Sequence, residues 1–356
     1  MKIIICCLNL YGGGAERVAS LWAKGFHNQG HDVILFLAEN KITYSIPDVP
    51  IVVIGNGQSS IKQYFDWYKI FKKEFNRLHP DVFISVNHPW AIIAKIASIG
   101  LGLRIVSTEH NAYEKPNYIK MGMLDKLHKF FFNRFVDIVT VLTKADFDYI
   151  GGRLKNVHVL PNPLTFAPLN EVPNKEKTIL AVGRLNSWHV KGFDLLINAW
   201  LKIAPKYPDW KLKIIGYGSD VNRNYIKSLA KNINSNQFEI LDFDKNIVEH
   251  YRKAAIFVLS SRYEGFGMAL VEAMSQGCAC IACDYKGRQQ EIITNMENGL
   301  IAEANDSNSI CHILDNLLSD ATLQHQLQNG AIIRAKDFEL KSIMNRWNII
   351  LLKFRK

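Results

Sequence analysis

The stretch that decides the fold runs from Ser260 to Met274 and reads SSRYEGFGMALVEAM. It follows the apolar run Ile256–Leu259, which predicts a buried strand, and it continues with the period of a helix. The two glycines between strand and helix let the backbone come close to a ligand, and the free N–H groups at a helix start favour an anion or hydroxyl groups. The stretch therefore predicts a ligand site at a strand-to-helix turn.

Two carboxylates belong to this turn. Glu264 precedes the glycines, and Glu272 lies about one turn into the helix, at a position that can face the same pocket. Ionised carboxylates accept several hydrogen bonds at once, which suits the hydroxyls of a sugar and a ribose. A plainer interpretation is an acidic residue that complements the helix dipole, followed by a solvated glutamate.

On both sides of this stretch, apolar runs of strand length alternate with helical patterns, which predicts parallel sheets covered by helices. In the first half we expect strands at Lys2–Asn9, Asp32–Leu37, Ile51–Ile54, Asp81–Val86, Arg104–Thr108, Asp137–Leu142 and Val157–Leu160, and helices that include Ala15–Asn28 and Ile61–Leu78. In the second half we expect strands at Thr178–Val182, Lys211–Ile215, Phe238–Leu241, Ile256–Leu259 and Cys278–Cys283, and a helix at Gly192–Ala204.

The 356 residues exceed the size at which one core keeps growing, so two domains are expected. Pro161-Asn162-Pro163 and the polar stretch Asn170–Lys177 have the composition of a linker. We therefore expect α/β domains at residues 1–165 and 170–335. Residues 336–356, which include the basic amphipathic pattern Leu340–Lys356, are expected to form a helix that packs back on the first domain. Ligands bind beyond the carboxyl ends of such strands, so two facing domains would offer a central cleft.

Composition narrows the class of protein. The chain is 48% hydrophobic and 21% charged, as in folded globular proteins, and its net charge of +10 suggests an anionic partner: nucleic acid, an acidic membrane face or a phosphate-bearing substrate. Apolar runs are shorter than the ~20 residues that span a bilayer, and Ile3–Leu8 is expected to be a first strand and not a signal peptide. The six cysteines indicate free thiols in a reducing cytoplasm, and Cys278, Cys280 and Cys283 fit buried small hydrophobes better than a metal cluster.

Two further motifs suit phosphate. Gly12-Gly13-Gly14 opens a helix directly after the first strand, although its spacing is not that of the dinucleotide fingerprint, and it can also be a simple tight turn. Arg184 and Lys191 lie at a strand end and beside a helix start, where a forked cation and a point charge suit a pyrophosphate. Two ordinary surface cations are the alternative.

Together these motifs resemble retaining glycosyltransferases of family 4, which have the GT-B fold of two Rossmann-like domains. The resemblance rests on Glu264 and Glu272 with seven residues between them, on the following Ala273–Gly277, and on the order of the other motifs. It implies that Glu272 binds the ribose of a donor nucleotide. It implies that the donor sugar is held by Glu264 and by the backbone of Gly265, Phe266, Gly267 and Met268.

The resemblance assigns the remaining candidate residues. Arg184 and Lys191 would neutralise the departing nucleotide without a metal or other cofactor. Gly13 and Gly14 would face the donor diphosphate, with Gly13 also near the acceptor, and His110 would line the donor-sugar pocket. Glu109, Asn111 and Lys115 are candidate acceptor contacts, and Gly216 and Phe243 belong to regions near the nucleoside. The sequence departs from the family at Tyr217, where an acidic residue is usual.

Two segments combine cations with aromatic residues: Ile61–His79, and Lys115–Phe135 with its run of phenylalanines. Such helices can lie in a membrane interface that contains anionic lipid, or the aromatics can be core and the lysines solvated. The sequence does not separate these two interpretations.

The resemblance implies transfer of a sugar, N-acetylgalactosamine or another hexose, from a UDP-sugar to a polyprenyl-diphosphate-linked saccharide in bacterial surface glycan assembly. The protein would then work in the cytoplasm, peripherally on the inner face of the membrane and without nucleic acid. The alternatives are a glycosidase that uses Glu264 and Glu272, a UDP-sugar epimerase, and a non-enzymatic basic protein that binds membrane or nucleic acid.

Overall fold

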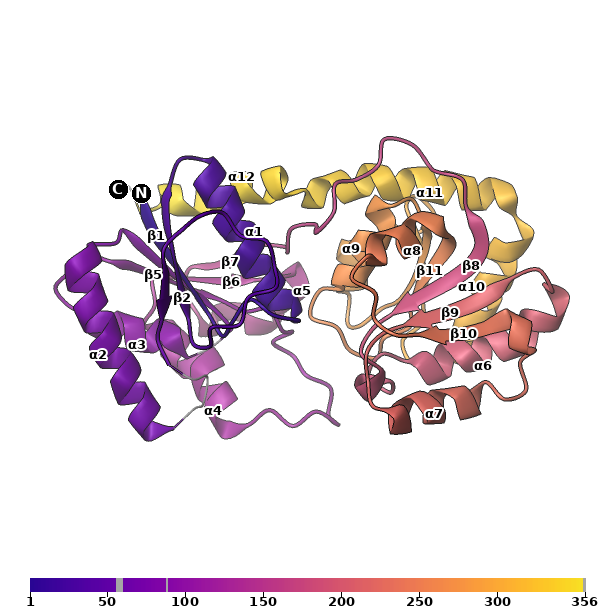
Figure 1. The fold of residues 1–356 in the computed structure, drawn as a ribbon, viewed down its shortest axis with the longest axis horizontal. Coiled ribbons are helices and arrows are strands. Elements are labelled where there is room, and N and C mark those ends of the chain that lie inside the picture. The colour runs from indigo at the N-terminus through magenta and orange to yellow at the C-terminus, as the bar shows by residue number, and fades with distance from the viewer. Residues whose placement is uncertain (56–59, 88, 355–356) are drawn as a thin grey trace. The chain divides into compact units, whose positions relative to one another are not determined.

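The computed structural model describes residues 1–55, 60–87 and 89–354, and the chain divides into two compact units (Figure 1). Unit 1 comprises Met1–Thr165 and Leu340–Lys356, and unit 2 comprises Phe166–Glu339. Each unit is built on one parallel sheet with helices on both faces. The predicted α/β class with two parallel sheets is confirmed.

The sheet of unit 1 has seven parallel strands in the order β3-β2-β1-β4-β5-β6-β7. Their bounds are Lys2–Cys7 (β1), Asp32–Leu37 (β2), Ile51–Val53 (β3), Val82–Val86 (β4), Arg104–Thr108 (β5), Ile138–Val141 (β6) and Val157–Val159 (β7). The strand order reverses between β1 and β4, and ligands in such sheets bind outside the carboxyl ends at this point.

Helices cover both faces of the unit 1 sheet. On one face, α1 (Gly14–Asn28) packs with the C-terminal helix α12 (Leu340–Leu352), and their apolar side chains include Trp22, Phe26 and Trp347. The other face carries α2 (Ile61–Leu78), α3 (Trp90–Ala97) and α5 (Lys144–Ile150). Figure 1 shows α12 beside α1. Residues 355 and 356 of the predicted terminal helix lie outside the described residues.

The sheet of unit 2 has six parallel strands in the order β10-β9-β8-β11-β12-β13. Their bounds are Glu176–Val182 (β8), Lys211–Ile215 (β9), Phe238–Leu241 (β10), Ala254–Leu259 (β11), Ala279–Cys283 (β12) and Leu300–Ala302 (β13). Sequence reasoning missed β13, because three residues are too few to show a period. The predicted linker ends earlier than expected, because Glu176 already pairs with Ala254.

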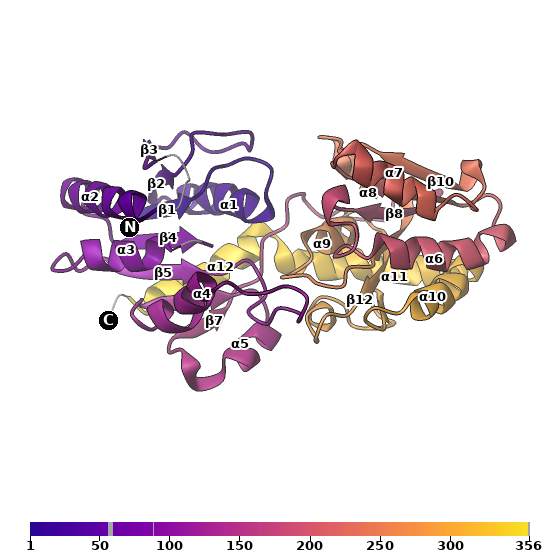
Figure 2. The same ribbon diagram turned by 90° about the horizontal axis from the view of Figure 1, so that it is seen from below.

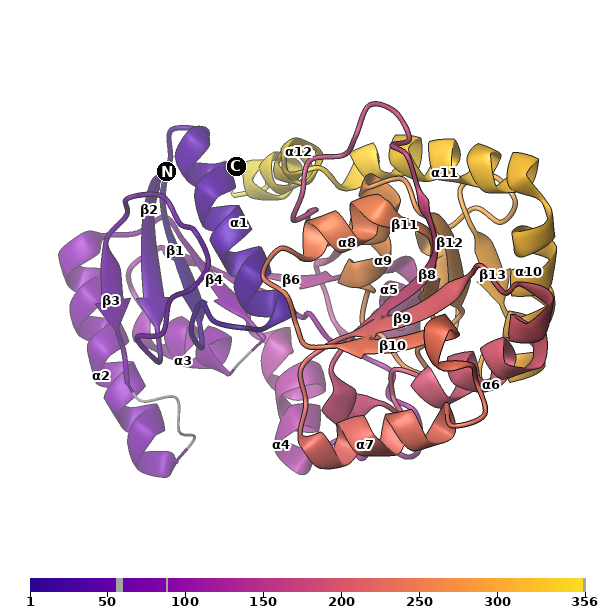
Figure 3. The same cartoon turned by 45° about the vertical axis from the view of Figure 1, so that its right-hand side comes forward.

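The unit 2 sheet lies between two groups of helices (Figure 3). One face carries α6 (Phe193–Ile203), α7 (Asp220–Leu229) and α10 (Ser307–Ser319). The other carries α8 (Ile247–Lys253), α9 (Met268–Ser275) and α11 (Ala321–Ala335). Buried parallel strands read as continuous apolar runs, which is why most strands were predictable.

The two basic aromatic segments differ in the structure. In α2, Trp67, Phe71 and Phe75 are core residues, so for these side chains the core interpretation holds. The segment Lys115–Phe135 is not one helix: a loop leads into the short α4 (Met123–Lys126), then a π-helical turn and a 3-10 turn. Figure 2 shows α4 as a short helix at the end of a long loop. Met123, Leu124, Phe131 and Phe135 of this segment are exposed.

All six cysteines are free thiols, and all but Cys311 are buried. Burial raises the pKa of the Cys278 thiol to about 11, so this thiol stays protonated at neutral pH. Among the described helices, none combines the length and apolar character that crossing a membrane requires.

Candidate active site

The predicted donor residues of unit 2 lie on loops at one edge of its sheet. Strands β8 and β11 are neighbours, and the strand order reverses between them. The loop after β8 carries Arg184 and Lys191, and the loop after β11 carries Glu264. These residues, far apart in sequence, therefore meet at the crevice where doubly wound sheets bind ligands.

Lys191 and Glu264 form the centre of this arrangement. The Lys191 Nζ donates to Glu264 Oε1 at 2.6 Å, and the side chains are only 20% and 14% exposed. The Ser261 hydroxyl donates to the same carboxylate oxygen at 2.7 Å. The pair places one cation and one hydrogen-bond acceptor side by side, which suits an anionic group next to a hydroxylated one.

Glycines let the loops approach each other. At Gly192, where φ is +64°, a Cβ would lie 1.9 Å from the Ser260 carbonyl oxygen. At Gly216, which follows β9, a Cβ would lie 1.8 Å from the Gly183 carbonyl oxygen. A larger residue at either position would force the backbones apart, so both glycines fix the shape of the site.

Glu272 lies inside α9 and is buried, so the plainer interpretation of a solvated glutamate is wrong. Its Oε2 accepts a hydrogen bond from the hydroxyl of Tyr251 on α8 at 3.2 Å. Tyr251 is itself fully buried. A buried carboxylate held by a tyrosine is a preoriented acceptor.

The segment between Glu264 and α9 can contact a ligand mainly through its backbone groups. Gly267 has φ +101° and begins the helix, with Met268 as its first residue, so its conformation strongly favours glycine. The Phe266 side chain is buried and packs against Phe338, with ring centroids 5.6 Å apart. Phe266, like Gly265 and Gly267, can therefore serve a ligand only through its backbone.

Three further residues at this edge are open to solvent. Arg184 is exposed, and its side chain makes no hydrogen bond or ion pair with another residue that the structure describes. Tyr217 and Phe243, on the loops after β9 and β10, are about half exposed. The loops that follow β8, β9 and β10, which are neighbours in the sheet, thus carry one exposed cation and two exposed aromatic rings.

In unit 1, the glycine turn follows β1 at the reversal point of that sheet. Gly12 has φ +69°, and Gly13 is the N-cap of α1, with Gly14 as its first residue. A Cβ on Gly13 would lie 1.8 Å from the Glu16 carboxylate, and the Gly13 carbonyl accepts from the Tyr44 hydroxyl at 3.1 Å. The glycine turn is thus contacted by the Glu16 side chain of α1 and by the Tyr44 hydroxyl.

His110 follows β5 and is held by several groups of unit 1. Its backbone N–H donates to Asn87 Oδ1 at 2.6 Å, Nδ1 lies 2.9 Å from Asn162 Oδ1, and Nε2 lies 3.2 Å from the Thr108 hydroxyl. The ring packs on Trp22, with centroids 5.2 Å apart. Burial lowers the pKa of His110 to about 4, so the imidazole is neutral at pH 7 and acts through hydrogen bonds.

The predicted acceptor residues have partners within unit 1. Glu109 lies 3.5 Å from the buried ammonium of Lys129 and accepts from the Asn111 backbone N–H at 3.2 Å. Lys115 Nζ donates to Asp125 at 3.3 Å. Their role toward an acceptor stays a prediction.

Sequence reasoning missed several supporting residues: Ser261, Arg262, Asp194, Tyr251, Asn87 and Asn162. Ser261 and Arg262 stand within three residues of Glu264, which was a usable signal. Asn162 lies between two prolines, which indicated a linker and gave no sign of its contact with His110.

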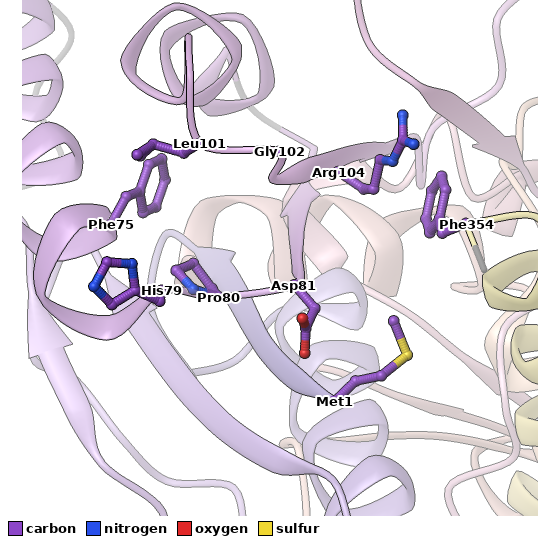
Figure 4. Close-up of a pocket in the computed structure, with 9 residues that line it drawn as sticks. All are labelled: Met1, Phe75, His79, Pro80, Asp81, Leu101, Gly102, Arg104 and Phe354. Atoms are coloured by element: carbon purple, nitrogen blue, oxygen red, sulfur yellow. The ribbon is translucent and has the colours of Figure 1, made fainter. Parts of the chain in front are cut away.

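A cavity of about 450 Å³ lies elsewhere in unit 1 (Figure 4). Its walls include Met1, Asp81 and Arg104, which stand at the amino ends of β1, β4 and β5. Ligand sites of parallel sheets lie at the opposite, carboxyl ends. The predicted site residues do not line its described walls.

Comparison with known proteins agrees with this geometry. Residues 12–165 match the model "Glycosyltransferase Family 4", and residues 166–334 match "Glycosyl transferases group 1". An uncharacterized glycosyltransferase of Haemophilus influenzae is 28% identical, over 95% of this chain and 96% of that protein. The N-acetylgalactosamine-N,N'-diacetylbacillosaminyl-diphospho-undecaprenol 4-alpha-N-acetylgalactosaminyltransferase of Campylobacter jejuni is 27% identical, over 95% of this chain and 96% of that protein.

The fold has solved counterparts. HepE of Anabaena, crystallised in complex with UDP, superposes with a TM-score of 0.80 at 19% identity, over 99% of this chain and 100% of that one. The two family models together cover both units from the glycine turn to α11. The chain therefore belongs to glycosyltransferase family 4 and has the GT-B fold.

Proposed function

We propose that this glycosyltransferase moves a sugar, with N-acetylgalactosamine as the first choice, from a UDP-sugar to a hydroxyl of a polyprenyl-diphosphate-linked saccharide, in the assembly of a bacterial surface glycan. The observation that carries the proposal is the Lys191–Glu264 pair at the reversal point of the unit 2 sheet, with exposed Arg184 on the same loop as Lys191. It offers cations for a diphosphate and a carboxylate for sugar hydroxyls.

The comparisons support the choice of substrates. The Campylobacter relative is named for transfer of N-acetylgalactosamine onto an undecaprenol-diphosphate-linked saccharide, and it matches this chain along nearly its whole length. HepE binds UDP on the same fold. A uridine diphosphate donor and a lipid-linked acceptor are the substrates most consistent with both.

Within this proposal each donor residue has one task. Glu272 accepts hydrogen bonds from the ribose, with Tyr251 fixing its orientation. Arg184 and Lys191 bind the diphosphate, and Glu264 accepts from a hydroxyl of the transferred sugar. Two cations offset the charge that develops on the departing UDP, so no metal is needed for this step.

Transfer proceeds with retention in this proposal. The bond between the anomeric carbon and the phosphate oxygen breaks, and the acceptor oxygen bonds to that carbon on the same face. The proton of the acceptor hydroxyl passes to the departing phosphate oxygen. His110, neutral at pH 7, contacts the sugar as a hydrogen-bonding group and does not act as an acid.

The acceptor lipid requires work at a membrane surface, which we assign to the inner, cytoplasmic face. The segment around α4 carries exposed Met123, Leu124, Phe131 and Phe135 together with Lys120, Lys126 and Arg134. Apolar side chains among cations suit an interface that contains anionic lipid. In α2, Trp67, Phe71 and Phe75 are core, which leaves Phe65 and Tyr68 as its exposed aromatic side chains, so the α4 segment with four exposed apolar side chains is the better candidate.

A donor screen tests the proposal. The purified protein is incubated with UDP-N-acetylgalactosamine, UDP-N-acetylglucosamine, UDP-galactose or UDP-glucose and a polyprenyl-diphosphate-linked saccharide, and the anomeric configuration of the product is determined by NMR. We expect one donor to be used at least tenfold faster than the others, with an α-linked product and undiminished rate in EDTA. An inverted product, or no transfer from any UDP-sugar, contradicts the proposal.

A further inference from the structure

The side chain of Arg262 connects the two loops that carry Lys191 and Glu264. Its Nη1 and Nη2 donate to the two carboxylate oxygens of Asp194, in the first turn of α6, at 2.7 and 2.6 Å. Nη1 also donates to the His189 carbonyl, and Nε donates to Asn305 Oδ1, both at 2.6 Å. All three guanidinium nitrogens are thus used, and all their partners lie outside the loop that contains Arg262.

The backbones of the two loops are joined at the same place. The Arg262 N–H donates to the Val190 carbonyl at 2.8 Å, and the Ser260 hydroxyl donates to the Lys191 carbonyl at 2.9 Å. Gly192 lies directly against Ser260, with no room for a Cβ. Lys191 is therefore fixed through its own carbonyl and through both neighbouring residues.

The Arg262–Asp194 pair has the properties of a rigid connection. A forked arginine–carboxylate pair fixes both distance and angle, whereas a lysine would make a single, freely rotating contact. The two side chains are only 10% and 20% exposed, so water and salt screen the pair little. A flexible lysine such as Lys191 keeps its position only if its backbone is held in this way.

We propose that Arg262 and Asp194 are positioning residues that set the separation of Lys191 and Glu264 for transfer. The inference rests on the proposed function, because it assigns Lys191 to the departing diphosphate. Neither residue touches substrate. A displacement of about 1 Å at a charge-stabilising group can cost on the order of a hundredfold in rate.

Two variants test the Arg262–Asp194 pair, which we call the clamp, without removing Lys191 or Glu264. Arg262→Lys keeps the charge and removes the fork, and Asp194→Asn keeps the shape and removes the charge. For both we expect kcat for UDP-sugar turnover to fall at least tenfold, with KM for the donor changed less than threefold. The reason is that precise placement of Lys191 matters most when charge develops on the leaving group.

Arg334→Lys is the matched control. Arg334 donates to Asp337 at 2.6 Å and to the carbonyls of Ile292 and Glu291, on α11 and away from the Lys191 loop. Arg334→Lys also removes a guanidinium whose three nitrogens are all hydrogen-bonded in the same unit, so a merely structural effect lowers the melting temperature in both arginine variants. We expect only Arg262→Lys to lower kcat, measured on protein shown to be folded by circular dichroism.

A double-mutant cycle with Lys191→Ala decides the mechanism. If Arg262 acts through Lys191, Arg262→Lys lowers the residual turnover of the Lys191→Ala protein less than twofold. A full tenfold loss in that background, or unchanged kcat in both clamp variants, overturns the inference. A wild-type protein that turns over no UDP-sugar overturns the proposed function instead, so the two failures are distinguishable.

Discussion

At the scale of single residues, Glu272 is the most specific donor contact in the proposal. Its carboxylate is buried and already accepts from Tyr251, so a Glu272→Gln substitution keeps the shape while halving the acceptor capacity. We expect UDP to bind at least tenfold more weakly, about 1.4 kcal/mol, by isothermal titration. Glu297→Gln, at an exposed position of the same unit, serves as control. Equal UDP affinity in all three proteins would remove Glu272 from the site.

The burial of His110 leads to a second prediction, which concerns how folding stability depends on pH. Burial lowers its pKa from 6.5 to about 4, so the unfolded chain binds the proton more readily between these values. The stability that His110 contributes is therefore complete above pH 6.5 and is lost as the pH falls towards 4. Between pH 7.5 and 5 we expect a loss of at most about 2 kcal/mol from this residue, absent in His110→Gln.

The measurement is urea unfolding of both proteins at the two pH values, followed by hydrogen exchange in unit 1. Other groups titrate equally in the two proteins, so the difference between their pH slopes isolates His110. Identical slopes would mean that the imidazole is not buried in the way its contacts with Trp22 and Asn162 indicate.

Some residues of the site were predictable and others were not, for a physical reason. Glu264 and Lys191 stand in local patterns of strand, glycine and helix, which sequence reveals. The residues that position these two side chains come from distant parts of the chain. Arg262 and its partner Asp194, for example, are 68 positions apart in sequence. Only the fold brings such pairs together, and nothing in the local pattern of Asp194 distinguishes it from an ordinary first-turn acid.

At the scale of elements, α12 is an integral part of unit 1. Trp347 is fully buried, 5.1 Å from the Trp22 ring and 5.6 Å from Phe26. We expect Trp347→Ala to lower the free energy of unfolding of unit 1 by about 3–5 kcal/mol, because it removes a fully buried tryptophan from this contact.

Hydrogen exchange of β1 and β4 peptides reports unit 1 separately from unit 2. The control is Ile349→Ala on the same helix, where the side chain is 65% exposed and the expected change is within about 0.5 kcal/mol. A loss below 1 kcal/mol for Trp347→Ala would show that the sheet does not depend on α12.

The α4 segment carries the prediction on membranes. We expect the double substitution Met123→Ser and Leu124→Ser to reduce co-sedimentation with anionic vesicles at least threefold, because both side chains are well exposed beside cations. Val221→Ser, equally exposed on α7 of unit 2, is the control. Wild-type binding that is no stronger to anionic than to neutral vesicles contradicts the membrane assignment.

Some helices and strands could be predicted from the sequence, and others could not. The buried strands were found because parallel strands are apolar throughout. Lys115–Phe135 was treated as a helix because it combines cations with aromatic residues, whereas the structure forms a loop followed by three short helical turns. In α2 the same composition forms a regular helix, because Trp67, Phe71 and Phe75 fall on one face and pack on the sheet.

At the scale of the whole molecule, the two units repeat one topology. In each, the first strand is central, the order reverses beside it, and a glycine turn follows it: Gly12–Gly14 after β1 and Gly183 after β8. The repeat was predictable because the pattern of strands restarts after the linker. The cations and the paired glutamates belong only to the second copy among these described motifs, so unit 2 is the expected nucleotide-binding unit.

Nucleotide binding is therefore the most direct measurement of the central claim. The melting temperature is recorded with UDP, GDP or ADP, for the wild type and for an Arg184→Ala, Lys191→Ala double variant. We predict that UDP stabilises the wild type, by about 2.7 kcal/mol at a hundredfold excess over Kd, and stabilises the variant much less. A wild-type melting temperature that no nucleotide changes would contradict the account.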